Sequence, residues 1–435
     1  MNIFRHKKMA IAIVGAASIA LLASACSSGG GSSSDKGTTL TYWASNQGTS
    51  LANDKAVLTP LLNKFEKQTG IKVNLEVVGW NNLQTRINTA VTSGSGPDVV
   101  NIGNTWAPYL SATGAFLPYD SANMKAIGGA DKFVATALAT GGLKDKTPTS
   151  VPLYGLAYGL YYNKKMFSDA GLTPPKTWED MVSDAKKLTA NGVYGMGLEA
   201  GSYTENVHFA FITSEQNGAE LFNGQKANFT SAGTVDGVKR YLDLMQTDKV
   251  VNPSNAQYTT GTEASADFAK GKVAMIVNQD NAGALLASDG MATSDYGVVA
   301  IPSPEGGKNI SSGIQGINLS VFKNTKHKDA ALKFVKFMTS AATQGVLGKP
   351  YASIPVLKGV APTFTDDPTI AKTFSDIYNN ASAPYPLVPL EGAFETNVGN
   401  ALNTLFATVA TGGTVSSADV KAALKTAEEK TNSAG

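Results

Sequence analysis

The chain has 435 residues, of which 16% are charged, and a formal net charge of +2. This length is sufficient for two domains. The net charge is near zero, and arginine occurs only at positions 5, 86 and 240. Both features argue against a nucleic-acid-binding protein and favour a neutral ligand. The single cysteine, Cys26, excludes intramolecular disulfides.

The first residues have the layout of an export signal. Basic residues at positions 5 to 8 precede an apolar run over 9–25, and small residues lead into Cys26. At about 17 residues, interrupted by Gly15 and Ser18, the run is short for a membrane-spanning helix. We therefore predict that 1–25 is a cleaved signal peptide.

Two fates of Cys26 fit the residues around it. The Ala23-Ser24-Ala25 sequence fits ordinary secretory cleavage, which would leave a free N-terminal thiol. The stretch also resembles a bacterial lipoprotein signal, although Leu22 lies four residues before the cysteine rather than three. We favour lipidation of Cys26, because the Gly/Ser-rich residues up to position 37 would form the flexible tether that an anchored protein needs.

Short strands and helices alternate in the next part of the chain. We predict strands over 40–43, 71–78 and 98–102, and helices over 58–65 and 83–91, with Gly70 ending the first helix. This alternation indicates an α/β sheet. Ligands of such sheets bind beyond the carboxyl ends of the strands, so the loops after Trp43 and Ile102 are expected to line a site.

The remaining sequence continues the pattern. We expect helices over 181–188, 235–245 and 328–340, strands over 273–277 and from 296, and a fraying helix over 423–435. Thr177 and Asp180 form a capping-box pattern, and Trp178 between them is expected to be a packing residue. We expect His208 to be a satisfied buried histidine rather than a metal ligand.

Four segments, in this order, resemble the extracellular solute-binding proteins of ABC importers, in particular the oligosaccharide-binding family that includes maltodextrin-binding proteins. They begin with SGSGPDVVNIGNTWAPYL at position 93, VPLYGLAYGLYYNKKMF at 151, FAKGKVAMIVNQD at 268 and YGVVAIPSPEGGKNISSGIQGIN at 296. The resemblance implies two α/β lobes joined by hinge crossovers, with the ligand in the cleft between them. The first lobe would take 38–153 and 300–355, and the second 154–299 and 356–435, after a lipid-anchored tether over 26–37.

The resemblance also implies a function. The chain would be a monomeric receptor at the outer face of the cell membrane, of the Gram-positive kind, that delivers a neutral oligosaccharide to an ABC permease. It would have no cofactor, no metal and no catalytic residue.

The candidate ligand residues combine aromatic rings, which pack on sugar C–H faces, with amides and carboxylates, which bind hydroxyls. The first-lobe loops supply Trp43, Asn46, Gln47, Trp80, Asn104, Thr105 and Trp106. The resemblance adds Tyr154, Tyr158, Tyr203, Glu205, Gln279, Asp280, Asn281, Gly313, Gln315, Gly316, Glu391 and Glu395.

Several of these residues have a second reading. Trp43 fits a strand-end core position equally well, and Trp80 could staple the next helix. Tyr203 and Glu205 are expected in a loop, and Gly313 and Gly316 in a glycine-rich loop that would let the backbone approach the ligand. Glu391, Phe394 and Glu395 are expected to precede the C-terminal helix.

Other functions are alternatives. Asn281 stands where the family often has an aromatic residue. The lack of that aromatic residue would suit a smaller polar ligand, such as a polyol or a glycerol phosphodiester. An S-x-x-K match at Ser183 lies inside a predicted helix without its companion motifs, and no H-E-x-x-H, P-loop or G-x-S-x-G occurs. A secreted carbohydrate hydrolase and a surface adhesin are the alternatives from other classes.

Overall fold

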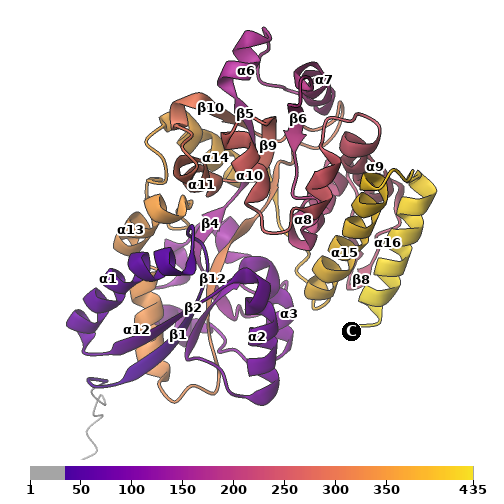
Figure 1. Ribbon diagram of the computed structural model, residues 1–435. Coiled ribbons are helices and arrows are strands. Elements are labelled where there is room, and N and C mark those ends of the chain that lie inside the picture. Colours follow the sequence, from indigo (N-terminus) through magenta and orange to yellow (C-terminus); the bar gives the residue numbers. More distant parts are fainter. Residues whose placement is uncertain (1–34, 435) are drawn as a thin grey trace, which may run out of the picture. The chain divides into compact units, whose positions relative to one another are not determined.

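The computed structural model describes residues 35–434, which form an α/β structure with two main sheets (Figure 1). The five-stranded sheet, in the order β2-β1-β3-β12-β4, is the centre of the first lobe. The four-stranded sheet, in the order β10-β5-β9-β6, is the centre of the second lobe. The predicted α/β class is confirmed.

The strands are short, and most belong to these two sheets. The first sheet contains β1 (Thr39–Ser45), β2 (Lys72–Val78), β3 (Val99–Gly103), β4 (Ser150–Leu156) and β12 (Gln315–Val321). The second contains β5 (Tyr158–Asn163), β6 (Tyr194–Gly197), β9 (Val273–Gln279) and β10 (Tyr296–Val299). Two further pairs join β7 (Phe222–Asn223) with β8 (Lys226–Ala227), and β11 (Ser312–Gly313) with β13 (Ser382–Ala383).

Helices cover the sheets. Those of the first lobe are α1 (Leu51–Thr69), α2 (Trp80–Ser93), α3 (Ala107–Ala112), α4 (Ser121–Ala126), α5 (Ala135–Leu138), α12 (Lys328–Met338) and α13 (Ala341–Tyr351). Those of the second are α6 (Lys164–Asp169), α7 (Trp178–Leu188), α8 (Tyr203–Gln216), α9 (Ala232–Gln246), α10 (Glu263–Ala269), α11 (Ala282–Ser288), α14 (Pro368–Asn380), α15 (Glu391–Ala410) and α16 (Ser417–Asn432). Short 3-10 turns are η1 (Asn104–Trp106), η2 (Ala130–Lys132), η3 (Pro253–Gln257) and η4 (Thr293–Asp295).

Strands β3, β4 and β12 of the first sheet are buried on both faces, whereas the edge strand β2 is partly exposed. Strand β1 runs parallel to β2 and β3, whereas β12 is antiparallel to β3 and β4. Tyr42 packs in one cluster with α1 and α12, and Val100 and Ile102 pack in another with α2 and α3. Because β1 and β3 are parallel neighbours, the loop 46–50 and the turn η1 both follow their carboxyl ends at one edge of the sheet.

The second sheet is packed in the same way. Leu160 and Met275 share a hydrophobic cluster with residues of α7, α8, α9, α15 and α16, while Tyr161 and Ile276 share the other cluster with α10, α11 and α14. In Figure 1, α15 and α16 lie beside α8 and α9.

The chain passes between the two sheets at position 157 and over 300–311, and these crossovers are tied to each other. The N–H of Tyr158 donates to the Ser312 hydroxyl at 3.0 Å, and the Ser311 hydroxyl donates to the carbonyl of Tyr158 at 3.1 Å. The N–H of Ala157 donates to Asp280 Oδ1 at 2.9 Å. The crossovers therefore form one hydrogen-bonded strip next to the candidate site.

Local signals explain several helix ends. Gly70 ends α1 in the left-handed conformation, with φ of 74°, as predicted. The capping box of Thr177 and Asp180 is present at α7, and Trp178 is buried in the core of the second lobe, so both predictions are confirmed. The tail is helical over Ser417–Asn432, and its buried residues pack in the same core.

Two placements differ from the sequence prediction. Tyr203 and Glu205 lie in the first turn of α8, which Ser202 caps, so the prediction of a loop there was wrong. Glu391, Phe394 and Glu395 do precede α16, but they lie in the first turns of α15, a helix that the apolar pattern did not reveal.

Some predictions are not tested by this structure. Cys26 and the signal peptide 1–25 lie outside the described residues, as does the tether up to residue 34. The predicted lobe boundaries remain a prediction, because one hydrophobic cluster contains residues from both sheets, such as Leu40 of β1 and Tyr161 of β5. Over residues 35–434, no helix combines the length and the apolar character needed to cross a bilayer.

Candidate functional site

Trp106 lies in the turn η1, directly after β3, where the first lobe meets the second. Its side chain is only 7% exposed, and its ring makes an edge-to-face contact with Trp80, with 5.4 Å between ring centroids. The indole Nε1–H donates a hydrogen bond of 3.0 Å to Glu395 Oε2 of α15. Two predicted residues from opposite lobes, 289 positions apart, are thus in direct contact.

Asn104 and Thr105 precede Trp106 in the same turn, and both are buried. The Asn104 amide donates to the carbonyl of Ile314 at 2.8 Å, which fixes its orientation. Its Oδ1 atom is buried and has no hydrogen-bond partner among the described residues. Asn104 therefore offers an unused acceptor next to Trp106.

The first turns of α15 carry a buried pair of carboxyl groups. Glu391 is 0% exposed and Glu395 is 3% exposed, one helical turn apart. Burial, reinforced by the neighbouring carboxyl group of Glu395, raises the pKa of Glu391 well above its usual value. Burial also raises the pKa of Glu395, although its Oε2 accepts the hydrogen bond from Trp106. The two carboxyl groups therefore resist carrying two negative charges at once.

A second contact between the lobes lies beside this pair. Tyr109 of α3 packs against Gly392 of α15 so closely that a Cβ atom on Gly392 would come within 2.8 Å of the Tyr109 ring. About two turns further along α15, the carbonyl of Tyr203 lies 2.2 Å from where a Cβ on Gly399 would be. Both glycines let α15 approach its neighbours closely.

Tyr158 connects the crossover to the same region. Its hydroxyl donates to Glu205 Oε2 at 2.8 Å and lies 2.8 Å from His208 Nδ1. His208 Nε2 in turn lies 3.9 Å from Glu395 Oε1. Burial lowers the pKa of His208 to about 3, so the imidazole is neutral and hydrogen-bonded, and the prediction of a satisfied buried histidine is confirmed.

Glu205 gives the site a pH dependence that can be measured. Burial raises the pKa of Glu205 from 4.5 to about 7, against the hydrogen bond from Tyr158. The unfolded chain releases this proton at lower pH than the folded protein does, so stability falls as the pH rises from 4.5 to about 7. Glu205→Gln keeps an acceptor for Tyr158 and removes the titration, so we expect it to raise the free energy of unfolding by about 1–2 kcal/mol at pH 8.

Urea unfolding of both proteins at pH 5, 6, 7 and 8 tests this prediction. The difference between the two stabilities should grow with pH and level off near pH 8. A difference that is the same at every pH would show that Glu205 does not titrate with a raised pKa.

The predicted glycine-rich loop is mostly strand, with Gly313 in β11 and Gly316 in β12, so the prediction of a loop there was wrong. Gln315 is buried, and its amide donates to the Tyr385 hydroxyl at 2.7 Å. A Cβ on Gly313 would come within 1.9 Å of the Tyr385 ring, and one on Gly316 within 2.5 Å of the Tyr154 carbonyl. Packing alone therefore requires glycine at both positions, and an approach of their backbone to a ligand remains a prediction.

Four further predicted residues lie along the crossover. Asp280 is buried and accepts the N–H of Ala157, and burial raises its pKa well above the usual range for aspartate. Gln279 pairs with Tyr158 across β5 and β9, and Asn281 follows Asp280 before α11 begins. Tyr154 is buried and packs on Tyr351, with 5.7 Å between ring centroids.

The remaining predicted residues lie at the end of β1. Trp43 is half-buried, and the Arg86 guanidinium lies 4.1 Å from its ring centroid. Asn46 and Gln47 follow in the loop before α1, and Gln47 Oε1 is buried without a partner among the described residues. Gly392, which packs on Tyr109, and Tyr385, which packs on Gly313, were not among the predicted residues. Residues in unpredicted or irregular segments carry no periodic signal.

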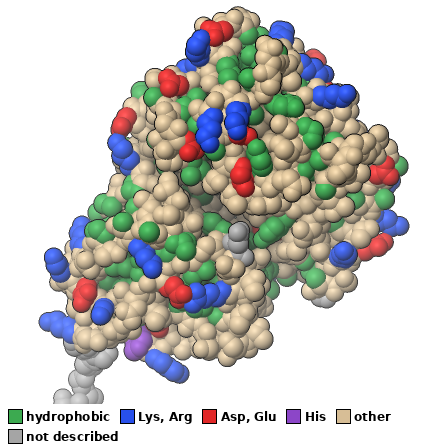
Figure 2. All heavy atoms as spheres, viewed as in Figure 1, with side chains coloured by type: hydrophobic (Ala, Val, Ile, Leu, Met, Phe, Trp, Pro, Cys, Tyr) green, Lys and Arg blue, Asp and Glu red, His purple; other side chains and the backbone are tan. Residues whose placement is uncertain are grey.

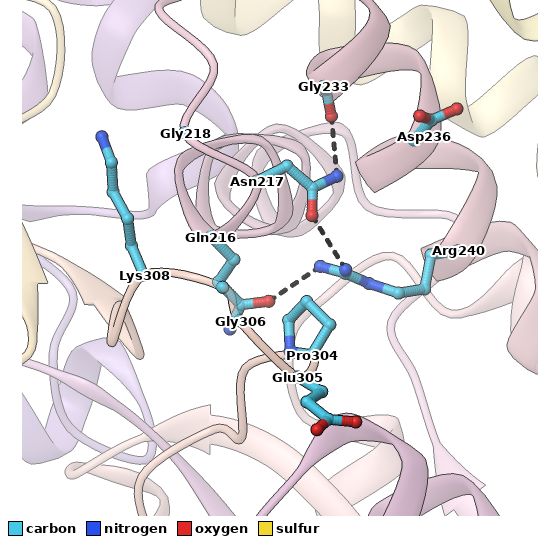
Figure 3. A pocket seen from close by; sticks show the side chains of 11 residues that line it. Gln216, Asn217, Gly218, Gly233, Asp236, Arg240, Pro304, Glu305, Gly306 and Lys308 are labelled. Atoms are coloured by element: carbon cyan, nitrogen blue, oxygen red, sulfur yellow. Dashed lines mark hydrogen bonds between the residues drawn. The ribbon is translucent and has the colours of Figure 1, made fainter.

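Two hollows on the second lobe lie elsewhere. One, of about 560 Å³, lies between the end of α8, the helix α9 and the loop 304–308. There Arg240 donates to Asn217 and Gln216, both at 2.9 Å, while Lys308 and Asp236 extend away from it (Figure 3). The other, of about 630 Å³, is bordered by residues 189–194 and 412–414. No predicted site residue lines either hollow.

The charges near the lobe contact are distinctive. Over residues 35–434, the ion pairs formed by lysine or arginine do not include Glu205, Glu391 or Glu395. On the outer face in Figure 2, by contrast, basic and acidic side chains are interspersed. No group of three or more metal-binding side chains occurs within the described part of the chain. The lobe contact thus combines aromatic rings, amides and carboxyl groups of raised pKa, which suits hydroxyl groups better than anions.

Comparisons with known proteins identify the family of this chain. The family described as bacterial extracellular solute-binding protein matches residues 48–345. A Brucella abortus protein is 28% identical over 281 residues, and the match covers 63% of this chain and 66%, just under two thirds, of that protein. The diacetylchitobiose binding protein DasA of Streptomyces coelicolor is 28% identical over 366 residues, which is 80% of this chain and 82% of DasA.

The fold is also that of solved solute-binding proteins. The GacH receptor of Streptomyces glaucescens, solved unliganded and in complex with acarbose, superposes with a TM-score of 0.76. It is 22% identical, and the match covers 91% of this chain and 98% of the receptor. This likeness confirms the predicted two-lobed fold. The family match over more than half of the chain shows that this protein belongs to the bacterial extracellular solute-binding proteins.

Proposed function

We propose that this protein captures a neutral oligosaccharide outside the cell and presents it to an ABC permease. The observation that carries the proposal is a set of buried acceptor atoms without partners among the described residues. They belong to both lobes and include Gln47 Oε1, Asn104 Oδ1 and Glu395 Oε1. A buried acceptor is costly unless it receives a hydrogen bond, and sugar hydroxyls are suitable donors.

The aromatic residues support the same ligand class. Trp80 and Trp106 lie beside these acceptors, in edge-to-face contact with each other. Sugars combine apolar C–H faces with hydroxyl edges, so a ligand of this class can use an indole ring and an amide oxygen together. DasA, which is named for diacetylchitobiose, supports a saccharide ligand as well.

The carboxyl groups favour a neutral ligand over a phosphodiester. Glu391 and Glu395 are buried, and burial raises the pKa of each. A phosphodiester would bring a negative charge next to these groups, without a lysine or arginine in an ion pair with them among the described residues to compensate it. The acidic pair therefore argues against the glycerol phosphodiester alternative.

The two lobes suggest how binding is communicated. Trp106 and Glu395 come from different lobes, so a sugar that contacts both would favour the state in which the lobes are close. A ligand shifts such an equilibrium only by its better affinity for one state. The permease would then recognise the closed, loaded receptor.

Location outside the cell follows from the export signal in the sequence. We expect the mature chain to begin with lipidated Cys26 and to be held at the outer face of the membrane by the tether 26–37, as a monomer. Intact mass spectrometry of the membrane-extracted protein tests the anchor. A mass that corresponds to a free thiol at Cys26 would rule it out.

Ligand titration tests the proposed function directly. Residues 35–435 would be titrated with maltotriose, cellotriose, diacetylchitobiose, acarbose, mannitol, ribitol and a glycerol phosphodiester, followed by tryptophan fluorescence and calorimetry. We expect micromolar or tighter binding to at least one oligosaccharide, with a fluorescence change from Trp80 and Trp106. Binding of a glycerol phosphodiester, with none of the saccharides bound, would overturn the proposed ligand class.

A further inference from the structure

Asp54 is a fully buried acidic residue in the first turn of α1, and a ligand loop is folded around it. Its carboxylate accepts the backbone N–H of Gly48 at 2.9 Å and that of Gln47 at 3.2 Å. The Asn46 side-chain amide also donates to it. Asp54 itself is 0% exposed. Three consecutive residues of the loop are thus bound to one side chain.

The loop has little freedom to adopt another shape. A Cβ on Gly48 would come within 2.1 Å of Asn53 Oδ1, so a larger residue there would require the Asn53 side chain to move. Asn46 N–H donates to the Val78 carbonyl at 3.1 Å, which ties the start of the loop to the end of β2. Ser50 then caps α1 by accepting the N–H of Asn53 at 3.1 Å.

Buried tyrosines surround the Asp54 carboxylate. Burial, followed by the charge of Asp54, raises the pKa of Tyr351 above its usual value. Burial also raises the pKa of Tyr42 and of Tyr154, and the charge of Asp54 adds to both effects. A buried carboxylate in such surroundings needs several hydrogen-bond donors, and the loop 46–48 supplies them.

The consequence concerns Gln47. Its side-chain amide nitrogen donates to the Asn46 carbonyl at 3.0 Å, which turns the Oε1 atom away from that bond. Gln47 Oε1 is buried and has no partner among the described residues. The same arrangement that satisfies Asp54 therefore leaves one acceptor of the loop unused.

We propose that Asp54 is a positioning residue of the sugar site, which holds the loop 46–48 so that Gln47 Oε1 can accept a ligand hydroxyl. Asp54 does not touch the sugar itself. The identity of the ligand in this proposal rests on the proposed function. The ordering of the loop rests on the hydrogen bonds of Asp54. The two parts can be tested separately.

The first test needs no ligand. Amide hydrogen exchange would be measured by mass spectrometry on the full chain, for wild type, Asp54→Asn and Glu199→Gln. Asparagine keeps one oxygen that can accept loop N–H groups, but the NH2 group in place of the second oxygen cannot accept and faces the donating amide of Asn46, which displaces the loop. We expect exchange at Gln47 and Gly48 to become at least tenfold faster in Asp54→Asn.

Glu199→Gln is the matched control. Glu199 is also a buried acid that accepts a backbone N–H, that of Ala264, but it lies in the second lobe. It should leave exchange at Gln47 and Gly48 unchanged. If Asp54→Asn fails to fold, Asp54→Glu, which keeps the charge and displaces it by one methylene, replaces it in the comparison. Wild-type exchange rates at Gln47 and Gly48 in the folded variant would overturn the proposal.

The second test measures coupling to Gln47. Affinities for maltotriose and diacetylchitobiose would be compared among wild type, Asp54→Asn, Gln47→Ala and the double variant. We expect each single change to weaken binding about tenfold, and the double variant to be little weaker than either, because both act on the same acceptor. Independent, multiplying losses would overturn the positioning role. If neither saccharide binds wild type, the proposed ligand class fails, while hydrogen exchange still decides whether Asp54 orders the loop.

Discussion

Replacing Trp106 with alanine is expected to reduce saccharide affinity by at least about 100-fold, or roughly 2.7 kcal/mol. The change removes an aromatic surface next to Trp80 and the only indole donor to Glu395 within the described residues. It also leaves Glu395 Oε2 with fewer donors in a buried position. Because Trp106 is 7% exposed, we also expect a loss of stability of about 3 kcal/mol. Calorimetric titration and thermal unfolding measure the two effects.

A second buried tryptophan provides the control that separates binding from stability. Trp178 is 5% exposed and packs in the second lobe, with the Arg240 guanidinium 4.8 Å from its ring centroid. Trp178→Ala should therefore lower the melting temperature without a comparable loss of affinity. Trp106→Phe keeps a ring and removes the hydrogen bond to Glu395, and it should lose about tenfold in affinity. Equal affinities of Trp106→Ala and Trp178→Ala would contradict a binding role for Trp106.

Much of the fold could be predicted because its signals are local. The alternating strand over 72–78, the Gly70 helix end and the Thr177 capping box each depend on residues close in sequence. Helix α15 could not be predicted in this way, because it is packed on several sides by α8, α9 and α16 and so lacks a single apolar stripe.

The candidate site could be predicted only in part. The position of Trp106 after β3 follows from the rule that ligands bind beyond strand ends, so its loop could be found from the sequence. Its contact with Glu395 could not, because the two residues are 289 positions apart and belong to different lobes. Tyr385, which packs against Gly313, follows no helical or strand pattern, and the buried role of Asp54 is visible only once the loop 46–48 is folded around it.

The buried acids Glu391 and Glu395 should also decide which sugars are rejected. We expect wild type to bind a uronate, in which a carboxylate replaces a hydroxymethyl group, at least about 100-fold more weakly than the matching neutral saccharide, because like charges at close range cost several kcal/mol. Burial raises the pKa of both acids, so the pair gains negative charge as the pH rises, and discrimination should be stronger at pH 8 than at pH 5.

Neutralising the pair tests this selectivity. The double variant Glu391→Gln/Glu395→Gln keeps the shape of both side chains and an acceptor for Trp106, but it removes the charge. It should bind the uronate and the neutral saccharide within about tenfold of each other, with little dependence on pH, because a specificity that rests on repulsion disappears with the repelling group. Glu199→Gln removes a buried acid elsewhere and should keep the wild-type discrimination. If the double variant rejected the uronate as strongly as wild type does, shape rather than charge would set the selectivity, and the carboxyl pair would lose its place in the proposed choice of a neutral ligand.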